Sequence, residues 1–154
     1  KNIPIWITNF LNKKFLKFKK QFKCSNKIYI DRSDSKFSHF KIYNQKNIID
    51  YLKKKGFKTY KLSKLNFFKQ IYLFNSAKII LGSHGAGFAN LSFCKPKTKV
   101  YGILTKKESN RLAIKTICKH LKIKYIKIIA SNSKYQKNSL FNVFVDLNKI
   151  KKIF

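Results

Sequence analysis

The sequence has 154 residues, which is enough for one domain with its own hydrophobic core. It carries 36 basic residues against five acidic ones, and only Arg32 and Arg111 among the basic residues are arginines. Specific nucleic-acid binders usually gather their charge on one face and use arginine for bidentate contacts. A net charge of +31 spread over lysines therefore favours a solvated surface over a specific nucleic-acid partner.

Amphipathic and apolar segments alternate along the chain, so helices and strands are expected in turn. In chain order we expect a helix over 9–22, a strand over 27–31, a helix over 44–56, a strand over 57–62, a helix over 66–77, a strand over 78–82, a short helix over 86–93, a strand over 99–104, a helix over 108–121, a strand over 124–130 and a polar loop over 131–139. Residues 142–147 are expected to form either a last short strand or the approach to a terminal helix over 148–154. Asparagine precedes two of the helices as a preferred cap, and Gly56 ends the first of these.

Two of these helices are predicted to bury aromatic faces. In the first helix the apolar residues suit one face: Phe10, Leu11, Phe15, Phe18 and Phe22. In the helix over 66–77 the aromatic residues are expected to pack on the sheet rather than to form a sugar-stacking surface: Phe67, Phe68, Tyr72 and Phe74.

Strands that alternate with helices of about ten residues are typical of βαβ units and of a parallel sheet covered on both faces. Right-handed crossovers then give a Rossmann-like, doubly wound α/β domain, which we expect over 27–154. In such sheets ligands bind beyond the carboxyl ends of the strands. The turns at 31–34 and 82–87 both follow predicted strands, so the binding site is expected there.

The turn at 82–87 has the sequence GSHGAG and precedes the short apolar helix. Its three glycines leave room for a ligand to approach the backbone. The N–H groups at the start of a helix favour an anion. The turn is therefore predicted to hold a phosphate-bearing ligand, with His84 beside it.

Three familiar glycine motifs do not fit this turn. An esterase oxyanion loop needs a serine in G-x-S-x-G, which does not occur here. A dinucleotide fingerprint needs G-x-G-x-x-G at the first strand, and a Walker loop needs Gly-Lys-Ser/Thr. What remains is a non-Walker phosphate cradle on a later strand, of the kind that two-domain GT-B transferases use for the diphosphate of a nucleotide sugar.

The segments IYIDRSDS, IYNQKNIIDYLKKKGF, FFKQIYLFNSAKIILGSHGAGFANLSF, KVYGI and RLAIKTICKHLKIKYIKI resemble glycosyltransferase family 61, the old DUF563 group, over about residues 27–130. The strongest element is an ordered pattern of Gln70, Phe74, Ala77, Gly82, His84, Gly85, Ala86, Gly87, Asn90 and Phe93. The chain departs from the family at Lys41, where arginine is frequent, and at Gln45, where glutamate is frequent.

The resemblance implies an inverting transferase with a GT-B fold, of which this chain would be the C-terminal, donor-binding half. A nucleotide sugar, with UDP as the expected nucleotide, would be the donor, and a glycan in surface polysaccharide synthesis the acceptor. Residues 1–26 would form a linker helix from an N-terminal acceptor domain that this chain lacks. The alternative is a non-catalytic module that binds nucleotides or polyanions, or a truncated relic.

The glycine-rich turn supplies most of the expected donor-binding residues. The backbone N–H groups of Gly85, Ala86 and Gly87 are expected to bind the donor phosphates. Ser83 is expected either to add a hydroxyl group or to cap the helix. His84 is expected to bind the β-phosphate and stabilise the leaving diphosphate, or to act as a base. Asn90 either contacts the ligand or fixes the turn.

Outside the turn, the resemblance extends the donor site to Lys41 and Asn44. Arg32 follows the first strand, and its planar guanidinium suits a donor phosphate. Asp34 is the expected catalytic base, and Asp31 is the alternative. An Asx-type turn at the strand end would explain either carboxylate without catalysis, and the base could also come from the missing half.

The cysteine and histidine content predicts a reducing compartment and no metal centre. The three cysteines form no C-x-x-C pair, and the three histidines show no zinc spacing. No apolar run reaches the roughly 18 residues of a membrane span. We therefore expect a cytoplasmic location, including the surface of the membrane.

Overall fold

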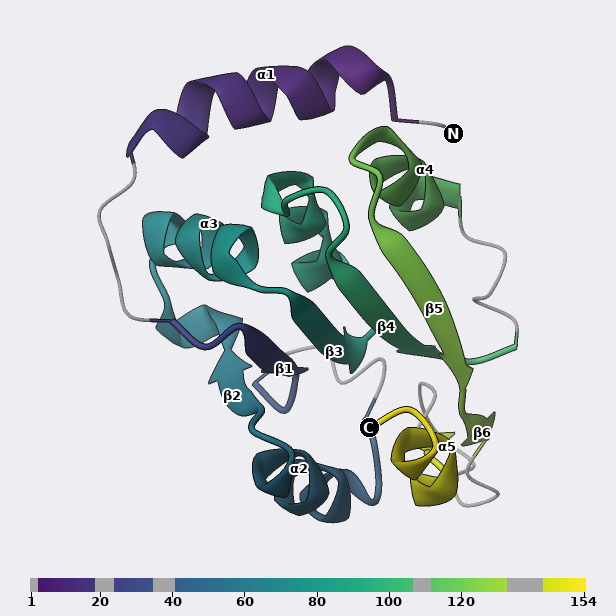
Figure 1. The fold of residues 1–154 in the computed structure, drawn as a ribbon. Coiled ribbons are helices and arrows are strands. Elements are labelled where there is room, and N and C mark those ends of the chain that lie inside the picture. The colour runs from purple at the N-terminus through teal and green to yellow at the C-terminus, as the bar shows by residue number, and fades with distance from the viewer. Residues whose placement is uncertain (1–2, 19–23, 35–40, 107–111, 133–142) are drawn as a thin grey trace.

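The computed structural model describes residues 3–18, 24–34, 41–106, 112–132 and 143–154 (Figure 1). Its α-helices are α1 (Ile5–Phe15), α2 (Gln45–Lys54), α3 (Phe67–Ser76), α4 (Leu112–His120) and α5 (Leu147–Lys151). Its strands are β1 (Lys27–Asp31), β2 (Lys58–Lys61), β3 (Ile79–Ser83), β4 (Lys99–Leu104), β5 (Lys124–Ile129), β6 (Ser131–Asn132) and β7 (Val143–Phe144). Short 3₁₀-helices follow α1, β2 and the glycine-rich turn: η1 (Leu16–Phe18), η2 (Leu62–Lys64) and η3 (Ala86–Phe93).

Five strands form one parallel sheet in the order β2-β1-β3-β4-β5. Because β1 lies between β2 and β3, the chain changes direction across the sheet between β1 and β3. In this register Ile30 pairs with Tyr60 on β2 and with Gly82 on β3. The predicted doubly wound, Rossmann-like α/β fold is confirmed, and its switch point lies between the ends of β1 and β3.

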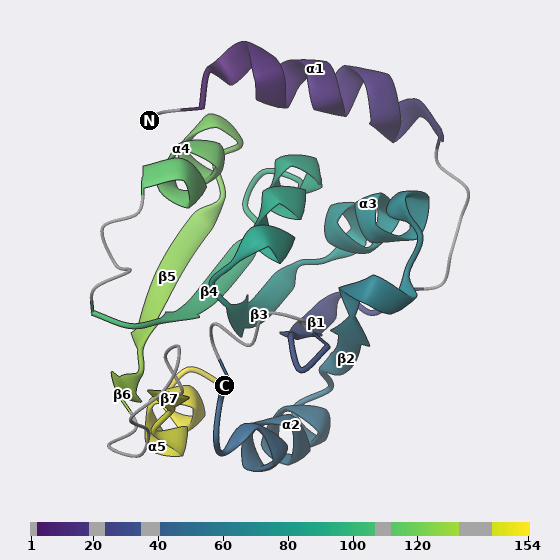
Figure 2. The ribbon, with the colours of Figure 1, turned by 180° about the vertical axis from the view of Figure 1, so that it is seen from behind.

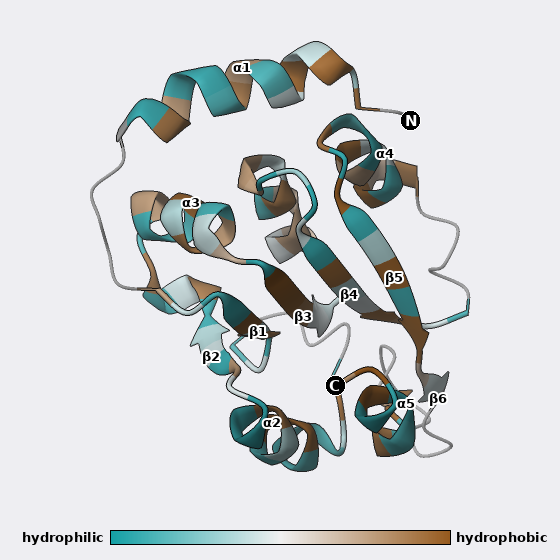
Figure 3. Cartoon of the chain, viewed as in Figure 1, coloured by the Kyte–Doolittle hydropathy of each residue, from teal (hydrophilic) through white to brown (hydrophobic). Residues whose placement is uncertain are grey.

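The strands alternate their side chains between two hydrophobic cores. One core joins Ile28, Ile80 and Val100 to apolar residues of α3, η3 and α4. The other joins Tyr29 and Leu81 to residues of α2 and α5. Front and back views show these helices on opposite faces of the sheet (Figures 1 and 2), and the central strands are strongly hydrophobic (Figure 3). Each fully buried side chain of this size contributes about 1.5–3 kcal/mol, so both layers stabilise the sheet.

Helix α1 forms an outer layer above α3, η3 and α4 (Figure 1). Leu11 and Phe15 pack against the core, and Asn12 Nδ2 donates to the Ser92 carbonyl at 2.6 Å. The helix begins at Ile5, four residues before the predicted start, and Pro4 occupies its N-cap position without a side-chain cap bond. The prediction for Phe10 is wrong: its side chain is 52% exposed.

Of the three helix-end signals at α2 and α3, two are confirmed in full. Asn66 caps α3 by accepting from Lys69 N at 2.9 Å. Gly56 ends α2 with φ of 80°, and its N–H donates to the Lys53 carbonyl. Asn44 occupies the N-cap position of α2, but its side chain makes no cap bond there.

Three further expectations need correction or fall outside the described residues. Phe74 is buried as predicted, whereas Phe67 and Phe68 are 47% and 49% exposed because they lie in the first turn of α3, at the rim of the core. The expected loop over 131–139 begins with a strand, because β6 pairs with β7. Residues 19–22 and 108–111 of the predicted helices, and 133–139 of the loop, lie outside the described residues.

Candidate functional site

The switch point of the sheet brings Arg32 to the glycine-rich turn. Arg32 follows β1 directly, and His84 follows β3 directly. Because β1 and β3 are parallel neighbours, both residues leave the sheet at the same edge. The Arg32 Nη1 atom donates a hydrogen bond to the His84 carbonyl at 2.5 Å. The two predicted turns therefore form one site.

Gly85 is required both by its backbone, with φ of 158°, and by the position of the Arg32 side chain. A Cβ atom at residue 85 would overlap the Nη1 and Cζ atoms of Arg32. The sequence predicted that this glycine leaves room for a ligand. The structure shows that the guanidinium occupies that space, so Gly85 lets a cation lie directly on the turn.

The other two glycines of the turn are explained by packing. A Cβ atom at Gly82 would come within 3.2 Å of the Phe88 ring, and one at Gly87 within 2.8 Å of Leu62 Cδ1. The absence of a side chain at Gly82 therefore leaves room for the Phe88 ring in the core. The absence of one at Gly87 lets Leu62 of η2 pack against the start of η3.

Helix η3 begins with backbone donors that have no acceptor inside the helix. Gly85 is the N-cap, and its carbonyl accepts from Phe88 N at 2.9 Å. The N–H groups of Gly85, Ala86 and Gly87 precede this first bond, so the helix itself does not satisfy them. The residue between the two glycines, Ala86, is exposed. Such an end suits an anion.

Ser83 and His84 are held inside the domain. Ser83 is the buried last residue of β3 and pairs with Ile103, so the expectation that it caps the helix is wrong. His84 is only 8% exposed, and its N–H donates to the Ile103 carbonyl at 2.8 Å. Its ring centre lies 6.5 Å from that of Phe88, at 62°. These contacts fix the backbone of the turn against β4.

Asn90 fixes the turn through a chain of amide groups. Its Nδ2 atom donates to the Gly87 carbonyl at 3.2 Å and to Gln70 Oε1 at 3.0 Å. Gln70 in turn donates to the carbonyls of Leu62 and Leu65, each at 3.0 Å. This network joins η3, α3 and η2, as expected from the interpretation that Asn90 faces inward.

The Asp31 carboxylate is enclosed by donors. It accepts from Ser33 N at 2.8 Å, which is an Asx-type turn, and from Ser33 Oγ at 3.1 Å. Gln45 Nε2 donates to it at 2.6 Å, and Lys61 Nζ lies 3.8 Å away. Asp31 itself is 5% exposed. Its hydrogen bonds join the end of β1 to the start of α2.

Asp34 is more accessible than Asp31, and its hydrogen-bond partner among the described residues is Ser63. The hydroxyl and the backbone N–H of Ser63 both donate to its Oδ2 atom. Partial burial acts to raise the pKa of Asp34, but the Ser63 hydrogen bonds and the charge of Lys61 outweigh it and hold the pKa below its usual range. The carboxylate is therefore ionised at neutral pH and weakly basic.

Lys41 and Asn44 lie between β1 and α2, and their backbone and amide groups contact the C-terminal segment. Asn44 Nδ2 donates to the Val145 carbonyl at 2.7 Å, and Val145 N donates to Asn44 Oδ1 at 3.1 Å. The Lys41 carbonyl accepts from Val143 N, and its side chain is exposed. The next residue along α2, Gln45, reaches Asp31, so this segment borders the end of β1.

Three residues at this edge were not singled out as partners by the sequence: Gln45, Lys61 and Ser63. Lys61 ends β2, which pairs with β1 so that Lys61 lies opposite Asp31. The expected pairing of these two strands could have identified Lys61, because neighbouring parallel strands end at the same edge of a sheet. The contacts of Gln45 and Ser63 depend on loop geometry that no local pattern encodes.

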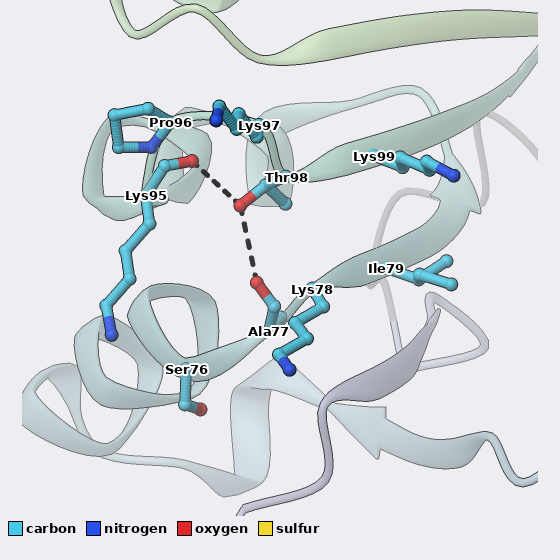
Figure 4. Close-up of a pocket in the computed structure, with 9 residues that line it drawn as sticks. All are labelled: Ser76, Ala77, Lys78, Ile79, Lys95, Pro96, Lys97, Thr98 and Lys99. Carbon is cyan, nitrogen blue, oxygen red and sulfur yellow. Dashed lines mark hydrogen bonds between the residues drawn. The ribbon is translucent and has the colours of Figure 1, made fainter.

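A pocket of about 460 Å³ lies at the opposite edge of the sheet (Figure 4). It is formed by the end of α3, the start of β3 and the turn before β4. Thr98 Oγ1 joins its walls through the carbonyls of Lys95 and Ala77, at 2.8 and 3.3 Å. Lysines dominate its lining: Lys78, Lys95, Lys97 and Lys99. Because it borders the amino ends of β3 and β4, it is separate from the Arg32–His84 site.

The described part of the chain contains neither a cluster of metal ligands nor a helix that could span a membrane. Within those residues, histidine, cysteine, aspartate and glutamate form no group of three that could hold a metal ion. No helix in the same ranges is both long and apolar enough to cross a bilayer.

A parallel sheet in the order β2-β1-β3-β4-β5, with a glycine-rich turn and an arginine at its switch point, defines a Rossmann-like α/β domain. Residues 2–101 match the sequence profile of the family Glycosyltransferase 61. The chain belongs to this family, which assigns it to the glycosyltransferases and suggests a nucleotide-sugar donor. No curated protein matches the chain.

The family match confirms the resemblance and sets its limits. It begins before α1 and ends in β4, so it includes both α1 and the complete Arg32–His84 site. The resemblance was expected over 27–130. The match therefore extends it toward the N-terminus, and α4 and β5 lie beyond its end.

Proposed function

We propose that this chain is the donor-binding domain of an inverting glycosyltransferase of GT-B architecture, in which residues 1–26 lead in from an acceptor domain. The observation that carries the proposal is the bond between Arg32 Nη1 and the His84 carbonyl at the switch point. It holds a cation over the N-terminus of η3. This is an arrangement suited to the two phosphates of a nucleoside diphosphate sugar.

The donor phosphates would bind between the guanidinium and the start of η3. A guanidinium carries five N–H donors, so Arg32 can bond a backbone carbonyl and a phosphate oxygen together. The N–H groups of Gly85, Ala86 and Gly87 would bond the phosphates from the other side. Ser83 and Lys41 would supply a hydroxyl and an ammonium group. Asn44 and Asn90 would act as positioning residues, since each amide bonds backbone groups.

His84 would stabilise the leaving nucleoside diphosphate. When the glycosidic bond to the donor breaks, negative charge grows on the β-phosphate. Stabilising that charge is the main electrostatic contribution this half of the enzyme can make. The imidazole lies in the turn that would carry the phosphates, and the backbone bonds of His84 to Ile103 and Arg32 hold it there.

Asp34 would serve as the base that removes the proton from the acceptor hydroxyl. Asp31 is nearly enclosed by Ser33, Gln45 and Lys61, whereas Asp34 is more accessible. The lowered pKa of Asp34 keeps it ionised but makes it a weak base. Proton transfer to it would therefore follow formation of most of the new glycosidic bond.

The expected acceptor is a glycan in surface polysaccharide synthesis, and the expected location is the cytoplasm. UDP is the first nucleotide to test. The proposal predicts saturable binding of UDP at about 0.15 M salt, where long-range attraction between surface charges is screened. Arg32→Ala should weaken this binding by about a hundredfold and Arg32→Lys by about tenfold, because lysine keeps the charge but loses the planar fork.

Isothermal titration calorimetry on these variants and on His84→Ala tests the proposal, with His120→Ala as the matched histidine control. Weaker binding by His84→Ala with unchanged binding by His120→Ala supports the assigned site. The alternative is a module that binds polyanions through its lysines. It predicts affinity that collapses with salt, ignores the nucleobase and does not depend on Arg32. If UDP, GDP and CMP all fail to bind saturably, the proposal is wrong.

A further inference from the structure

We infer that the outer face of α1 docks onto the surface of an anionic lipid bilayer. The inference does not depend on the donor site. It rests on the placement of apolar and basic side chains on a helix whose inner face is already packed against the domain.

The inner face of α1 fixes the helix on the domain. Thr8 is buried, Leu11 and Phe15 pack against the core, and Asn12 donates to the Ser92 carbonyl. The Phe15 ring also lies 6.4 Å from the Phe93 ring, in an edge-to-face arrangement. Because these contacts define which side faces inward, the outer face of α1 is defined as well.

The outer face exposes large apolar side chains in the N-terminal half of the helix. Ile5, Trp6 and Phe10 are 54%, 65% and 52% exposed. Trp6 and Phe10 are four residues apart, so they lie on the same side of the helix. Along its length α1 alternates between hydrophobic and hydrophilic residues (Figure 3). An aromatic pair of this kind is typical of helices that lie in a membrane interface.

Lysines continue the same face toward the C-terminal end of α1. Lys13 and Lys14 are exposed, and Lys14 Nζ lies 5.4 Å from the centre of the Phe10 ring. At about 100° per residue, Lys13 falls beside Trp6 on the side away from Phe10 and Lys14 falls beyond Phe10, so the two lysines flank the aromatic pair. The first acidic residue of the sequence is Asp31, so α1 itself carries no negative side chain.

These features together favour an anionic bilayer as the partner. An exposed apolar face alone would suit many surfaces, but here the aromatic side chains are flanked by lysines in a chain of net charge +31. Lipid headgroups of negative charge attract each nearby lysine, while the interface accepts tryptophan and phenylalanine. Neither contribution alone gives stable binding, and α1 presents both on one side.

The test uses Trp6, which is the single tryptophan of the chain and therefore a native reporter. Fluorescence of the 154-residue chain is followed with vesicles of phosphatidylcholine alone and with about 30% phosphatidylglycerol, at about 0.15 M salt. We expect a blue shift of Trp6 emission, and quenching by lipids brominated on the acyl chain, with the anionic vesicles only. No shift with anionic vesicles would overturn the inference.

Matched charge variants distinguish docking by α1 from attraction of the vesicles by the net positive charge of the chain. Lys13→Glu/Lys14→Glu should weaken vesicle binding by about tenfold or more. Lys46→Glu/Lys53→Glu changes the net charge by the same amount on α2, on the opposite face of the sheet, and should have little effect. Equal losses for the two pairs would show that net charge, and not α1, attracts the vesicles, and would overturn the inference.

Aromatic variants and protein concentration complete the test. Phe10→Ser should reduce the Trp6 shift, whereas Phe144→Ser, at an exposed phenylalanine on β7, should not. If Trp6 emission shifts with protein concentration in the absence of vesicles, the face binds a second copy of the chain instead. That result, checked by sedimentation, would also overturn the inference.

Discussion

Arg32 and Gly85 share one small volume: the guanidinium of Arg32 lies where a side chain at residue 85 would begin, and its Nη1 atom bonds the carbonyl of His84. The pair joins the end of β1 to the turn after β3. It is also the relationship on which the proposed donor site depends, because the guanidinium can occupy this position only beside a glycine.

Gly85→Ala should therefore displace the Arg32 guanidinium from the His84 carbonyl. The displaced group is the end of a flexible side chain, so we expect the fold to be kept and UDP affinity to fall by about tenfold. Denaturant unfolding gives a second readout. Gly85→Ala should destabilise the chain less when Arg32 is already alanine, since the overlap with the guanidinium is then gone and only the strain of a side chain at φ of 158° remains.

Gly102→Ala is the control for this experiment. Gly102 pairs with Gly82, but a Cβ atom there would overlap the Tyr125 hydroxyl in the β4–β5 pair and not Arg32. It should cost stability without any interaction with Arg32→Ala. Equal costs of Gly85→Ala in the presence and absence of Arg32 would mean that the arginine is not the reason for the glycine.

Gln45→Glu should place two carboxylates in contact at the end of β1. Gln45 Nε2 now donates to Asp31 Oδ1 at 2.6 Å, and an ionised glutamate has no proton to donate. The two negative charges would repel each other across this short contact. Protonation of one carboxylate at low pH relieves the repulsion, so the cost of the substitution grows as the pH rises.

We therefore expect Gln45→Glu to lower the free energy of unfolding by about 1–3 kcal/mol at pH 7, and by less near pH 4. Urea unfolding at several pH values measures this difference. Asn47→Asp adds a carboxylate at an exposed position of the same helix and should be nearly neutral. A cost for Gln45→Glu that does not change with pH would point to shape rather than charge.

Ser63→Ala should raise the pKa of Asp34 toward the ordinary value of about 3.9. The hydroxyl that now donates to Asp34 Oδ2 would be lost, while part of the burial would remain. A depressed folded-state pKa stabilises the fold above the unfolded pKa, and this contribution disappears as the pH falls through the folded value. Ser63→Ala should therefore show a weaker loss of stability on acidification.

Carbon-detected NMR of the Asp34 carboxyl group measures this pKa directly. Ser33→Ala serves as the control, because Ser33 bonds Asp31 and not Asp34 among the contacts of the described residues. An unchanged Asp34 pKa in Ser63→Ala would show that the hydroxyl does not hold the carboxylate.

The buried thiols predict a loss of stability in alkali. Burial raises the pKa of Cys118 to about 12, and that of its neighbour Cys94 is raised as well. Their unfolded-state pKa is about 8.5, so unfolding lets both thiols ionise above that pH. The contribution of these thiols to stability is therefore complete below about pH 8 and falls as the pH rises.

Thermal unfolding between about pH 7 and pH 10 tests this dependence in a Cys94→Ala/Cys118→Ala variant. The variant should be less stable at pH 7, because it leaves a cavity, but its stability should fall less steeply with pH. Cys24→Ala, at a half-buried position, is the control. Parallel slopes for all three proteins would refute the assignment of the alkaline loss to the two buried thiols.

The order of elements could be predicted from the sequence because each one satisfies local physics. Asn66 caps α3 and Gly56 ends α2 through backbone geometry that depends on the neighbouring few residues only. The alternation of buried strands and amphipathic helices then restricts the topology to a doubly wound sheet. The local sequence pattern did not predict that Phe10 is exposed. Contacts with η3 and α4 decide which face of α1 is buried.

The site was predictable in position but not in detail. Strand ends identified Arg32 and the glycine-rich turn, since the carboxyl edge of a parallel sheet collects such residues. Three contacts join residues 14 to 101 positions apart: the bond from Arg32 to the His84 carbonyl, the Gln45–Asp31 bond and the Asn44–Val145 bonds. No local spacing encodes them, and they follow only from the packed fold.

The most direct test of the donor site is an NMR titration of the isotope-labelled chain with UDP at about 0.15 M salt, because it reports where the nucleotide binds. We predict saturable shifts at Arg32 and in the turn from Ser83 to Asn90, which weaken in Gly85→Ala. Shifts confined to the lysine-lined pocket around Thr98 at the opposite edge of the sheet, or shifts that any polyanion reproduces, would contradict a donor site at the switch point.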